Sequence, residues 1–352
     1  MKKVLFFLSI LVGGLLQSPN VSSQGFGLPT KEWGIGFGNF PNYTGVRLNL
    51  IDKDIESIKG INITGWITED FEGQTGSFYG LGIGLPMAMG TENRYGVSVG
   101  LLATGAVEDV FGVNIGGLAT GGNNVFGVNI GGLATGAGEN LAGINIGGLA
   151  VGSGNNVSGI NIGGLAVGSG NNVSGITVSV LASGAGSKMT GFNFGGLAVG
   201  AGEKLVGINI GGLGVGAGEK VIGLNVSVLA IGAGETVAGI NLAGIAIGGT
   251  KVKGLSVAAV VGGTQVTGIT LAPVYFRITG SGFSSDEEPI MTGISISAFN
   301  HIQGVQKGLT IGIFNYAYRV KGVQIGLLNY NRSNPKGLRW LPIFNTGFGK
   351  KG

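Results

Sequence analysis

Apolar and polar positions follow a unit that recurs about every 16 residues from Gly112 to about Val274. Examples are GVNIGGLATGAGENLA, GINIGGLAVGSGNNVS and GINIGGLGVGAGEKVI. A short fixed period of this kind indicates stacked repeats. Fainter copies of the unit extend the array over almost the whole chain. The opening glycines of the regular units stand at positions 112, 127, 143, 159, 175, 191, 207, 223, 239, 254 and 268, with outlying ones at 45, 60, 293, 308, 322 and 337.

Within each unit, the parity of the apolar positions changes at a pair of glycines. Counting from Gly143 as zero, Ile144 and Ile146 stand at positions one and three, and Leu149 and Val151 stand at six and eight. Side chains alternate between the two faces of a strand, so the glycine pair is predicted to be a corner between two short strands. This interpretation places Ile146 in the core. Ile146→Asp is then expected to abolish folding, whereas a change of Asn145 to Ser is expected to be mild.

A polar turn and a further apolar position complete the unit. One apolar residue precedes each opening glycine by two places and is predicted to point inward. Strand, corner, strand, polar turn and return segment together predict an all-β fold, a single-chain parallel β-solenoid with 14–16-residue coils. At about 4.8 Å per coil, roughly 16 to 18 coils would give a long axis on the order of 80 Å. The predicted inward residues are Val125, Leu141, Val157, Val173, Met189, Leu205, Val221, Val237, Val252 and Val266.

Stacked coils place equivalent residues next to one another, so the repeated asparagines are expected to form a side-chain amide ladder. A repeated ligand-binding asparagine is the open alternative. The column comprises Asn129, Asn145, Asn161, Asn209, Asn225 and Asn241.

The alternative fold is an outer-membrane β-barrel with one strand per repeat, because the ten residues from Gly143 to Gly152 are long enough to span a bilayer. Pro273 and Pro342 would then stand in mid-strand, where a ladder N–H would be lost. The central repeats also lack aromatic girdles, and their turns do not alternate between short and long. These features favour the solenoid.

The chain divides by composition into five segments. Lys2 and Lys3, an apolar run and a polar end at Ser23 are typical of a secretory signal peptide. Bulky aromatic residues replace glycine near both ends of the array, which is typical of capping repeats. The predicted segments are the signal peptide (1–23), an N-terminal cap with irregular repeats (24–111), the regular repeats (112–274), a loop excursion (275–292) and C-terminal repeats with a cap (293–352).

Composition narrows the chemistry. The chain has 76 glycines among 352 residues and no cysteine, which excludes disulfides, thiolate metal sites and a lipidated cysteine. Its formal net charge is +4 with 11% charged residues, so no basic field for nucleic acid is expected. Glu203 with Lys204 and Glu219 with Lys220 recur at the polar turn and predict a line of mixed charge along one edge.

Candidate catalytic and metal-binding residues are few. His301 is the one histidine, so a His-based triad or a multi-histidine site is not expected. Asp52, Asp54 and Glu56 resemble the start of a calcium loop, but Ser57 replaces the required glycine and the distal glutamate is missing. Asp286, Glu287 and Glu288 are interpreted as part of a solvated loop. Glycosidases and lyases on β-helices need clustered carboxylates, which the central repeats lack. No enzyme activity, catalytic residue, cofactor or metal is therefore expected.

The units GLTIGIFNYAYRVK from Gly308 and GVQIGLLNYNRSNPK from Gly322 resemble the repeats of a family of Gram-negative surface-repeat proteins with Gly-rich GxxIGLxN-type units. The resemblance covers roughly residues 45 to 345. The central units are also distantly similar to the left-handed β-roll heads of trimeric autotransporter adhesins, although the chain has no heptad stalk and no evident C-terminal anchor. The resemblance implies an exported envelope or surface location and carries no functional residue.

Together these features predict a non-enzymatic, exported cell-envelope or surface protein that acts as a structural or adhesion and interaction scaffold. The alternative function is that of an outer-membrane channel or assembly factor. The expected location is the cell surface or outer membrane of a Gram-negative bacterium, or the extracellular medium. The expected partner is a protein or an envelope surface. Self-association and membrane contact stay open, and nucleic acid is not expected.

Overall fold

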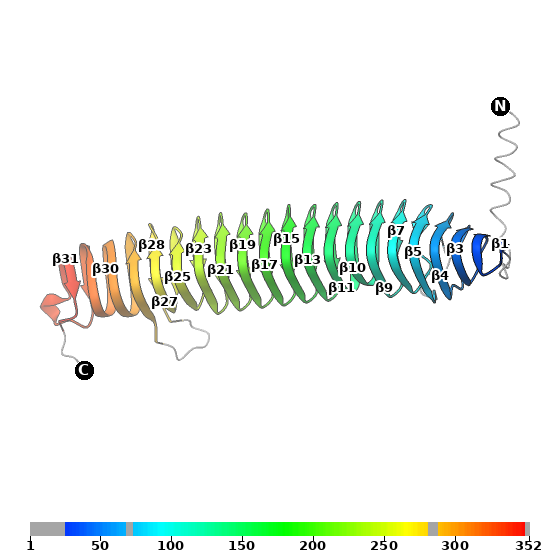
Figure 1. Cartoon of the computed structure of the whole chain (residues 1–352). Coiled ribbons are helices and arrows are strands. Elements are labelled where there is room, and N and C mark those ends of the chain that lie inside the picture. The colour runs from blue at the N-terminus through cyan, green and yellow to red at the C-terminus, as the bar shows by residue number, and fades with distance from the viewer. Residues whose placement is uncertain (1–24, 68–72, 281–287, 349–352) are drawn as a thin grey trace, which may run out of the picture.

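The computed structural model describes residues 25–67, 73–280 and 288–348, which form a long rod with the first and last described strands at opposite ends (Figure 1). The described residues contribute 31 strands to one continuous sheet that winds around the rod. Successive coils pair in parallel, with each residue beside its equivalent in the next coil, as in Ile160 beside Ile176. The predicted parallel β-solenoid is therefore confirmed. The predicted signal peptide (1–23) and positions 281–287 of the predicted loop lie outside the described residues.

One coil consists of a long strand, a corner, a short strand and a turn. β13 (Asn156–Gly163) ends at the glycine pair, and two residues separate it from β14 (Ala166–Ser169). A two-residue turn then leads to β15 (Asn172–Ser179), which lies beside β13. The predicted corner at the glycine pair is confirmed.

The strands differ in length by their place in the coil. The long strands are β3 (Asn42–Asn49), β4 (Ser57–Thr64), β5 (Ser77–Gly84), β7 (Asn93–Gly100), β9 (Asp109–Gly116), β13, β15, β17 (Lys188–Gly195), β19 (Lys204–Gly211), β21 (Lys220–Ser227), β23 (Thr236–Ala243), β25 (Lys251–Val257), β27 (Gln265–Leu271) and β29 (Ile290–Ile296). The short strands are β6 (Met87–Ala88), β8 (Ala103–Gly105), β12 (Ala150–Ser153), β14, β16 (Ala182–Ala185), β18 (Ala198–Ala201), β20 (Gly214–Ala217), β22 (Ala230–Ala233), β24 (Ala246–Gly248), β26 (Val260–Gly263) and β28 (Tyr275–Ile278). Strands that run through a turn are β10 (Ala119–Gly131), β11 (Ala134–Gly147) and β30 (Phe299–Asn331).

The opening glycine is a second corner, at which the long strand bends without ending. Gly159 has a φ of +98°, in the left-handed region that L side chains rarely adopt. A Cβ at this residue would also lie 2.1 Å from the carbonyl oxygen of Gly143 in the preceding coil. Both the bend and the close stacking therefore require glycine.

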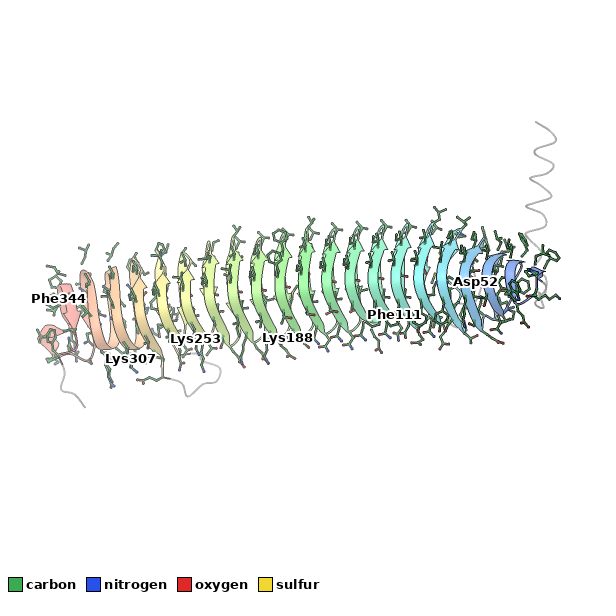
Figure 2. All side chains as sticks on the ribbon, in the orientation of Figure 1. Asp52, Phe111, Lys188, Lys253, Lys307 and Phe344 are labelled. Carbon is green, nitrogen blue, oxygen red and sulfur yellow. The ribbon has the colours of Figure 1, made fainter. Side chains whose placement is uncertain are left out.

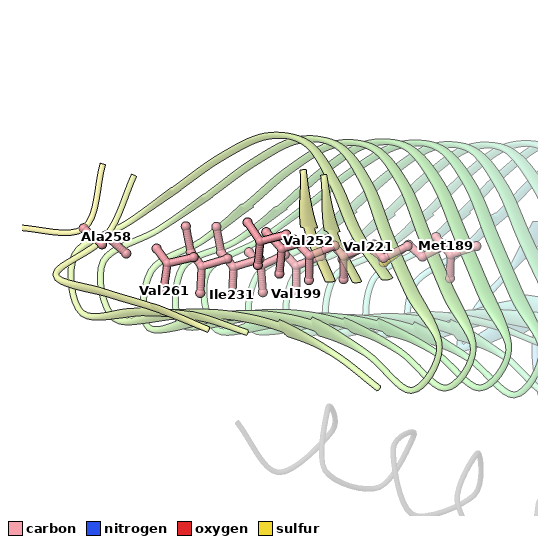
Figure 3. Close-up of a cluster of buried hydrophobic side chains, with 14 of the residues drawn as sticks. Met189, Val199, Val221, Ile231, Val252, Ala258 and Val261 are labelled. Carbon is pink, nitrogen blue, oxygen red and sulfur yellow. The ribbon is translucent and has the colours of Figure 1, made fainter. Parts of the chain in front are cut away.

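Two columns of apolar side chains fill the interior. One column comes from the residue two places before each opening glycine, such as Val157, and the other from the short strands, such as Val167. Figure 3 shows Met189, Val199, Val221 and other members of these columns in line inside the coils. All ten residues predicted to point inward from the position before the glycine are buried, so that prediction is confirmed.

The predicted inward position of Ile146 is wrong. Asn145 is fully buried, Ile146 is half-buried and Ile144 is exposed. The strand keeps its alternation as it passes through the bent glycine, so a residue four places after the inward Leu141 must also point inward. The isoleucines on either side of Asn145 then point outward. The expectation that Asn145 tolerates substitution better than Ile146 is withdrawn.

The buried asparagines form the predicted amide ladder. Asn129 Nδ2 donates to Asn145 Oδ1 at 2.9 Å, and Asn145 Nδ2 donates to Asn161 Oδ1 at 2.8 Å. A second run follows the same direction from Asn193 to Asn241, with donor–acceptor distances of 2.8–2.9 Å. These side chains are fully buried and bonded to one another, which confirms the structural ladder over the ligand-binding alternative.

Antiparallel strands close both ends of the parallel stack. β1 (Phe26–Pro29) pairs antiparallel with β2 (Trp33–Phe37), and β2 pairs parallel with β3. At the other end, β31 (Trp340–Thr346) runs antiparallel to β30, after the short 3₁₀ helix η1 (Lys336–Leu338). The alternative fold, in which every repeat would be one straight span of a closed antiparallel cylinder, is wrong because the coils pair in parallel.

Candidate interaction surface

The outward isoleucine and leucine side chains form one continuous surface, which we call the apolar face. Each central coil contributes positions one and three of its long strand and position six at the glycine corner, as in Ile160, Ile162 and Leu165. Three coils that have an apolar residue in place of the second corner glycine also contribute position five. These three side chains are 38%, 41% and 44% exposed. The most exposed members between residues 97 and 274 are Val97, Val99, Leu101, Leu102, Ile115, Leu118, Leu133, Ile144, Leu149, Ile160, Ile162, Leu165, Ile176, Val180, Leu181, Phe192, Phe194, Leu197, Ile208, Leu213, Val228, Leu229, Ile240, Leu242, Ile245, Leu255, Ile269, Leu271 and Val274.

The apolar face is unusually large. Its side chains together expose on the order of 2,000 Å² of apolar surface, whereas the largest patch on a typical monomer is about 300 to 600 Å². It also lies next to a flat surface formed by the short strands, whose outward residues are alanine and glycine, such as Ala166 and Gly168. Surfaces of this size and character mark a site of contact with another molecule.

Charged residues are confined to a different part of each coil. From Gly96 to Phe276, every charged residue lies in the polar turn or within the first three residues of a long strand, which together we call the charged edge. Figure 2 shows Lys188, Lys253 and Lys307 along the same edge of the rod. The members are Glu108, Asp109, Glu139, Lys188, Glu203, Lys204, Glu219, Lys220, Glu235, Lys251 and Lys253.

Ion pairs on the charged edge join neighbouring coils. Lys204 Nζ lies 3.7 Å from a carboxylate oxygen of Glu219, and Lys220 Nζ lies 3.6 Å from one of Glu235. The four side chains are well exposed, so each pair contributes little to the free energy of unfolding. The predicted line of mixed charge is present. Its ion pairs connect successive coils, whereas the sequence neighbours Glu203 and Lys204 form none that the structure records.

Stacked aromatic rings occupy the position directly before the opening glycine in four successive N-terminal coils. Tyr79, Tyr95, Phe111 and Phe126 stand one above another, with centroid distances of 4.9, 5.4 and 4.7 Å. Their faces cover one another, so mainly ring edges meet solvent. This column therefore stabilises neighbouring coils through ring stacking and offers no flat aromatic platform.

His301 lies within an aromatic group near the C-terminal end. Its Nδ1 lies 2.8 Å from Tyr275 Oη, and its ring meets that of Tyr316 edge to face at 5.0 Å between centroids. Partial burial, and then the charge of Arg277, lower the pKa of His301 below its ordinary value. The recorded hydrogen-bond partners of the imidazole are a tyrosine hydroxyl and the Gln303 amide, and they include no serine, cysteine or carboxylate.

Asp52 belongs to a buried polar cluster near the N-terminal end. Arg47 Nη2 donates to Asp52 Oδ1 at 2.9 Å, and Thr64 Oγ1 and Asn49 Nδ2 each donate to this carboxylate at 2.7 Å. Burial lowers the pKa of Arg47, and the charge of Asp52 opposes that shift. Protein donors surround the Asp52 carboxylate, whereas Asp54 and Glu56 are exposed and lie outside this cluster. The structure therefore does not bring the three residues of the calcium-like start together.

Arg94 is also buried near this cluster. Burial lowers the pKa of Arg94 to about 10, and the charge of Asp52 partly offsets the shift. The guanidinium lies over the ring of Phe78 at 4.6 Å from the centroid, and Nε donates to Ser98 Oγ at 3.2 Å. These contacts place the side chain inside the coils, away from the apolar face.

Clustered metal ligands are not found in the described part of the chain, where no group of three or more His, Asp or Glu side chains could hold an ion. Of the acidic loop residues, Asp286 and Glu287 lie outside the described residues, and Glu288 is exposed. Within positions 25–67, 73–280 and 288–348, no helix has the length and apolar character that a membrane span requires.

The apolar face does not follow from the sequence pattern alone. Its positions are apolar and are therefore predicted to lie in the core, whereas the structure exposes them. One sequence feature does indicate this face: no charged residue stands at positions one to ten of any unit between Gly96 and Phe276, as expected if all of these faces avoid water.

No protein-family model, curated protein or solved structure matches the chain.

Proposed function

We propose that the chain is a non-enzymatic, exported rod of the cell envelope or cell surface, and that it acts as an interaction scaffold through its apolar face. The observation that carries the proposal is the separation of the surface: isoleucine and leucine columns run the length of the central coils, and all charges of the same coils lie on the charged edge. A rod that worked alone in water would have no physical reason to expose this face.

Export is supported by the signal-like segment before Gln24. The interior is filled by valine, leucine and asparagine side chains, so the fold offers no channel along its axis. The alternative function as an outer-membrane channel depended on the closed cylinder and is not proposed.

The location is tested by expressing the full chain in a Gram-negative host, beside a variant that lacks residues 1–23. We expect the full chain in the envelope fraction, accessible to protease added outside the cell, and the shortened variant in the cytosol. Recovery of both proteins in the cytosol would contradict an exported role.

The role of the apolar face is tested by changing Ile144, Ile160, Ile176 and Ile208 to Thr in one variant. Threonine keeps the branching at Cβ and has a hydroxyl in place of the ethyl group of isoleucine, so the fold is expected to persist with an unchanged circular dichroism spectrum. The amount retained on washed envelopes should fall at least several-fold.

A matched control variant changes outward residues on the charged edge of the same coils to Thr. The control substitutions are Ala142, Ser158, Ser174 and Val206 to Thr. We expect retention of this variant to equal that of the unmodified chain. Equal retention of the face variant and the control would show that the apolar face is not the interaction surface.

A further inference from the structure

We infer that the apolar face is covered by the apolar face of a second copy of this chain, with the two rods side by side along their length. The inference rests on the proposed function as an interaction scaffold and names its partner. Three observations carry it: the area of the face, its repeat spacing and the distribution of charge.

The area of the face fits a permanent dimer. Covering about 2,000 Å² on each of two copies buries about 4,000 Å² in total, within the range of roughly 2,000 to 5,000 Å² for obligate homodimers. Such interfaces are also more apolar than the rest of a protein surface, as a face without charges would be.

The repeat spacing of the face favours a partner with the same period. Side chains on the face recur from coil to coil at the strand spacing of about 4.8 Å, because equivalent residues such as Ile144 and Ile160 are direct neighbours. Many of them are β-branched and hold few rotamers, so the surface is rigid and corrugated. Two surfaces interdigitate along their whole length only if their ridges have equal spacing, and a second copy meets this condition.

The charge distribution allows two copies to meet and gives a lipid surface no electrostatic attraction. The charged edge keeps its ions away from the face, so a face-to-face contact buries none of them. Between Gly96 and Phe276 it carries six acidic and five basic residues. Proteins that lie on anionic membranes rely on an excess of lysine and arginine, which this region lacks.

The oligomeric state of the mature chain is tested by analytical ultracentrifugation over a range of micromolar concentrations. We expect a dimer or a larger assembly. A face variant with Ile160→Lys and Ile176→Lys should be monomeric with an unchanged circular dichroism spectrum, because both side chains are exposed in the single rod, at 38% and 45%. Assembly of the face variant to the same mass would overturn the inference.

The control variant carries Ser158→Lys and Ser174→Lys on the same strands, at the outward position where Lys253 stands in a later coil. It adds the same charge and should keep the mass of the unmodified chain. A control that also became monomeric would show that added charge, and not the face, causes dissociation, and would count against the inference.

A second measurement does not depend on the lysine variants. Because the chain has no cysteine, a single Ile162→Cys substitution gives one thiol on the apolar face, and Ser158→Cys gives one on the charged edge. We expect mild oxidation to cross-link two copies efficiently through Cys at position 162 and poorly through Cys at position 158. Equal yields at the two positions would overturn the inference.

Vesicles of phosphatidylcholine separate the lipid alternative from the dimer. The lipid alternative would hold if the chain stayed monomeric and sedimented with these vesicles, and if the variant Ile160→Lys/Ile176→Lys lost this binding. A lipid surface would then take the place of the second copy. A monomer that is still retained on envelopes through the face would overturn the inference and leave the proposed function standing.

Discussion

At the scale of single residues, the buried asparagine column shows how a polar side chain can occupy a core. Each amide donates to the next and accepts from the previous one, so burial is compensated along the stack. The compensation stops at Thr177, which separates the two runs. Asn161 Nδ2, Thr177 Oγ1 and Asn193 Oδ1 are buried there without a hydrogen-bond partner.

Thr177→Asn should therefore stabilise the chain. The new amide would accept from Asn161 and donate to Asn193, which satisfies two buried groups, each costing about 1–3 kcal/mol when unpaired. We expect the denaturant midpoint to rise by an amount equivalent to about 1–3 kcal/mol. Ser174→Asn, an outward change on the same strand, is the control and should leave the midpoint nearly unchanged. A lower midpoint for Thr177→Asn would show that the ladder does not continue through this coil.

The glycines of one coil should differ sharply in their tolerance of a methyl group. Gly159→Ala places a Cβ at positive φ and 2.1 Å from the carbonyl oxygen of Gly143, so a loss of at least about 2 kcal/mol is expected. Gly168→Ala is the matched control, because its Cβ would lie 3.6 Å from the nearest atom, the carbonyl oxygen of Gly184. Urea unfolding followed by circular dichroism measures both. Similar losses in the two variants would contradict the assigned corner.

At the scale of one element, the long strand carries apolar residues on both faces but uses the two faces differently. In β11, Leu141 is fully buried and Asn145 faces the same interior, whereas Ile144 points outward. Hydrophobicity alone therefore does not identify the inner face. The inner face is marked by the column that packs against the short strands across the interior.

Leu141→Ala and Ile144→Ala should separate the two faces of this strand. Loss of the buried leucine leaves a cavity between the coils, so a destabilisation of about 2–5 kcal/mol is expected. Replacement of the exposed isoleucine should lower the free energy of unfolding by less than about 1 kcal/mol in the single rod. A further loss of stability is expected only where another molecule covers the apolar face. To measure the cost in the single rod, each alanine change is made in the background of the variant Ile160→Lys/Ile176→Lys, which is expected to be monomeric. The stability of each protein is then measured by thermal unfolding. A larger loss at Ile144 than at Leu141 would reverse the assigned faces.

At the scale of the whole molecule, the antiparallel end strands limit the length of the rod. A parallel stack ends in a row of unpaired N–H and C=O groups, which can pair with another chain. β31 covers that row at the C-terminal end through its pairing with β30, and β1 covers β2 at the other end. These strands prevent the coils of separate molecules from joining end to end.

Deletion of residues 332–352 should turn the rod into a polymer former. The deletion removes β31 and exposes the outer side of β30. We expect filaments or large aggregates in electron micrographs of the shortened chain, and a concentration-dependent rise in light scattering. The intact chain at equal concentration is the control. A shortened chain that stays dispersed at high concentration would show that other residues protect this end.

The repeat by itself determined much of this fold. A spacing of 14 to 16 residues, the glycine pair and the inward position before each opening glycine predict coils, corners and one core column, because stacked repeats place equivalent residues in contact. Asparagine at one fixed position predicts the ladder for the same reason. These features are local or depend on neighbouring copies of one unit.

Tertiary structure alone decided which face of the long strand is the inside. Local alternation allows either parity, and an apolar residue such as Ile146 fits a core as well as an interface. The choice follows from the short strands, whose inward valines pack across the interior against Leu141 and its equivalents and so leave Asn145 inside and Ile144 outside. The apolar face, and with it the proposed interaction surface, exists because a closed coil can turn only one side of the long strand inward, and the side that carries Ile144 and Ile146 is the other one.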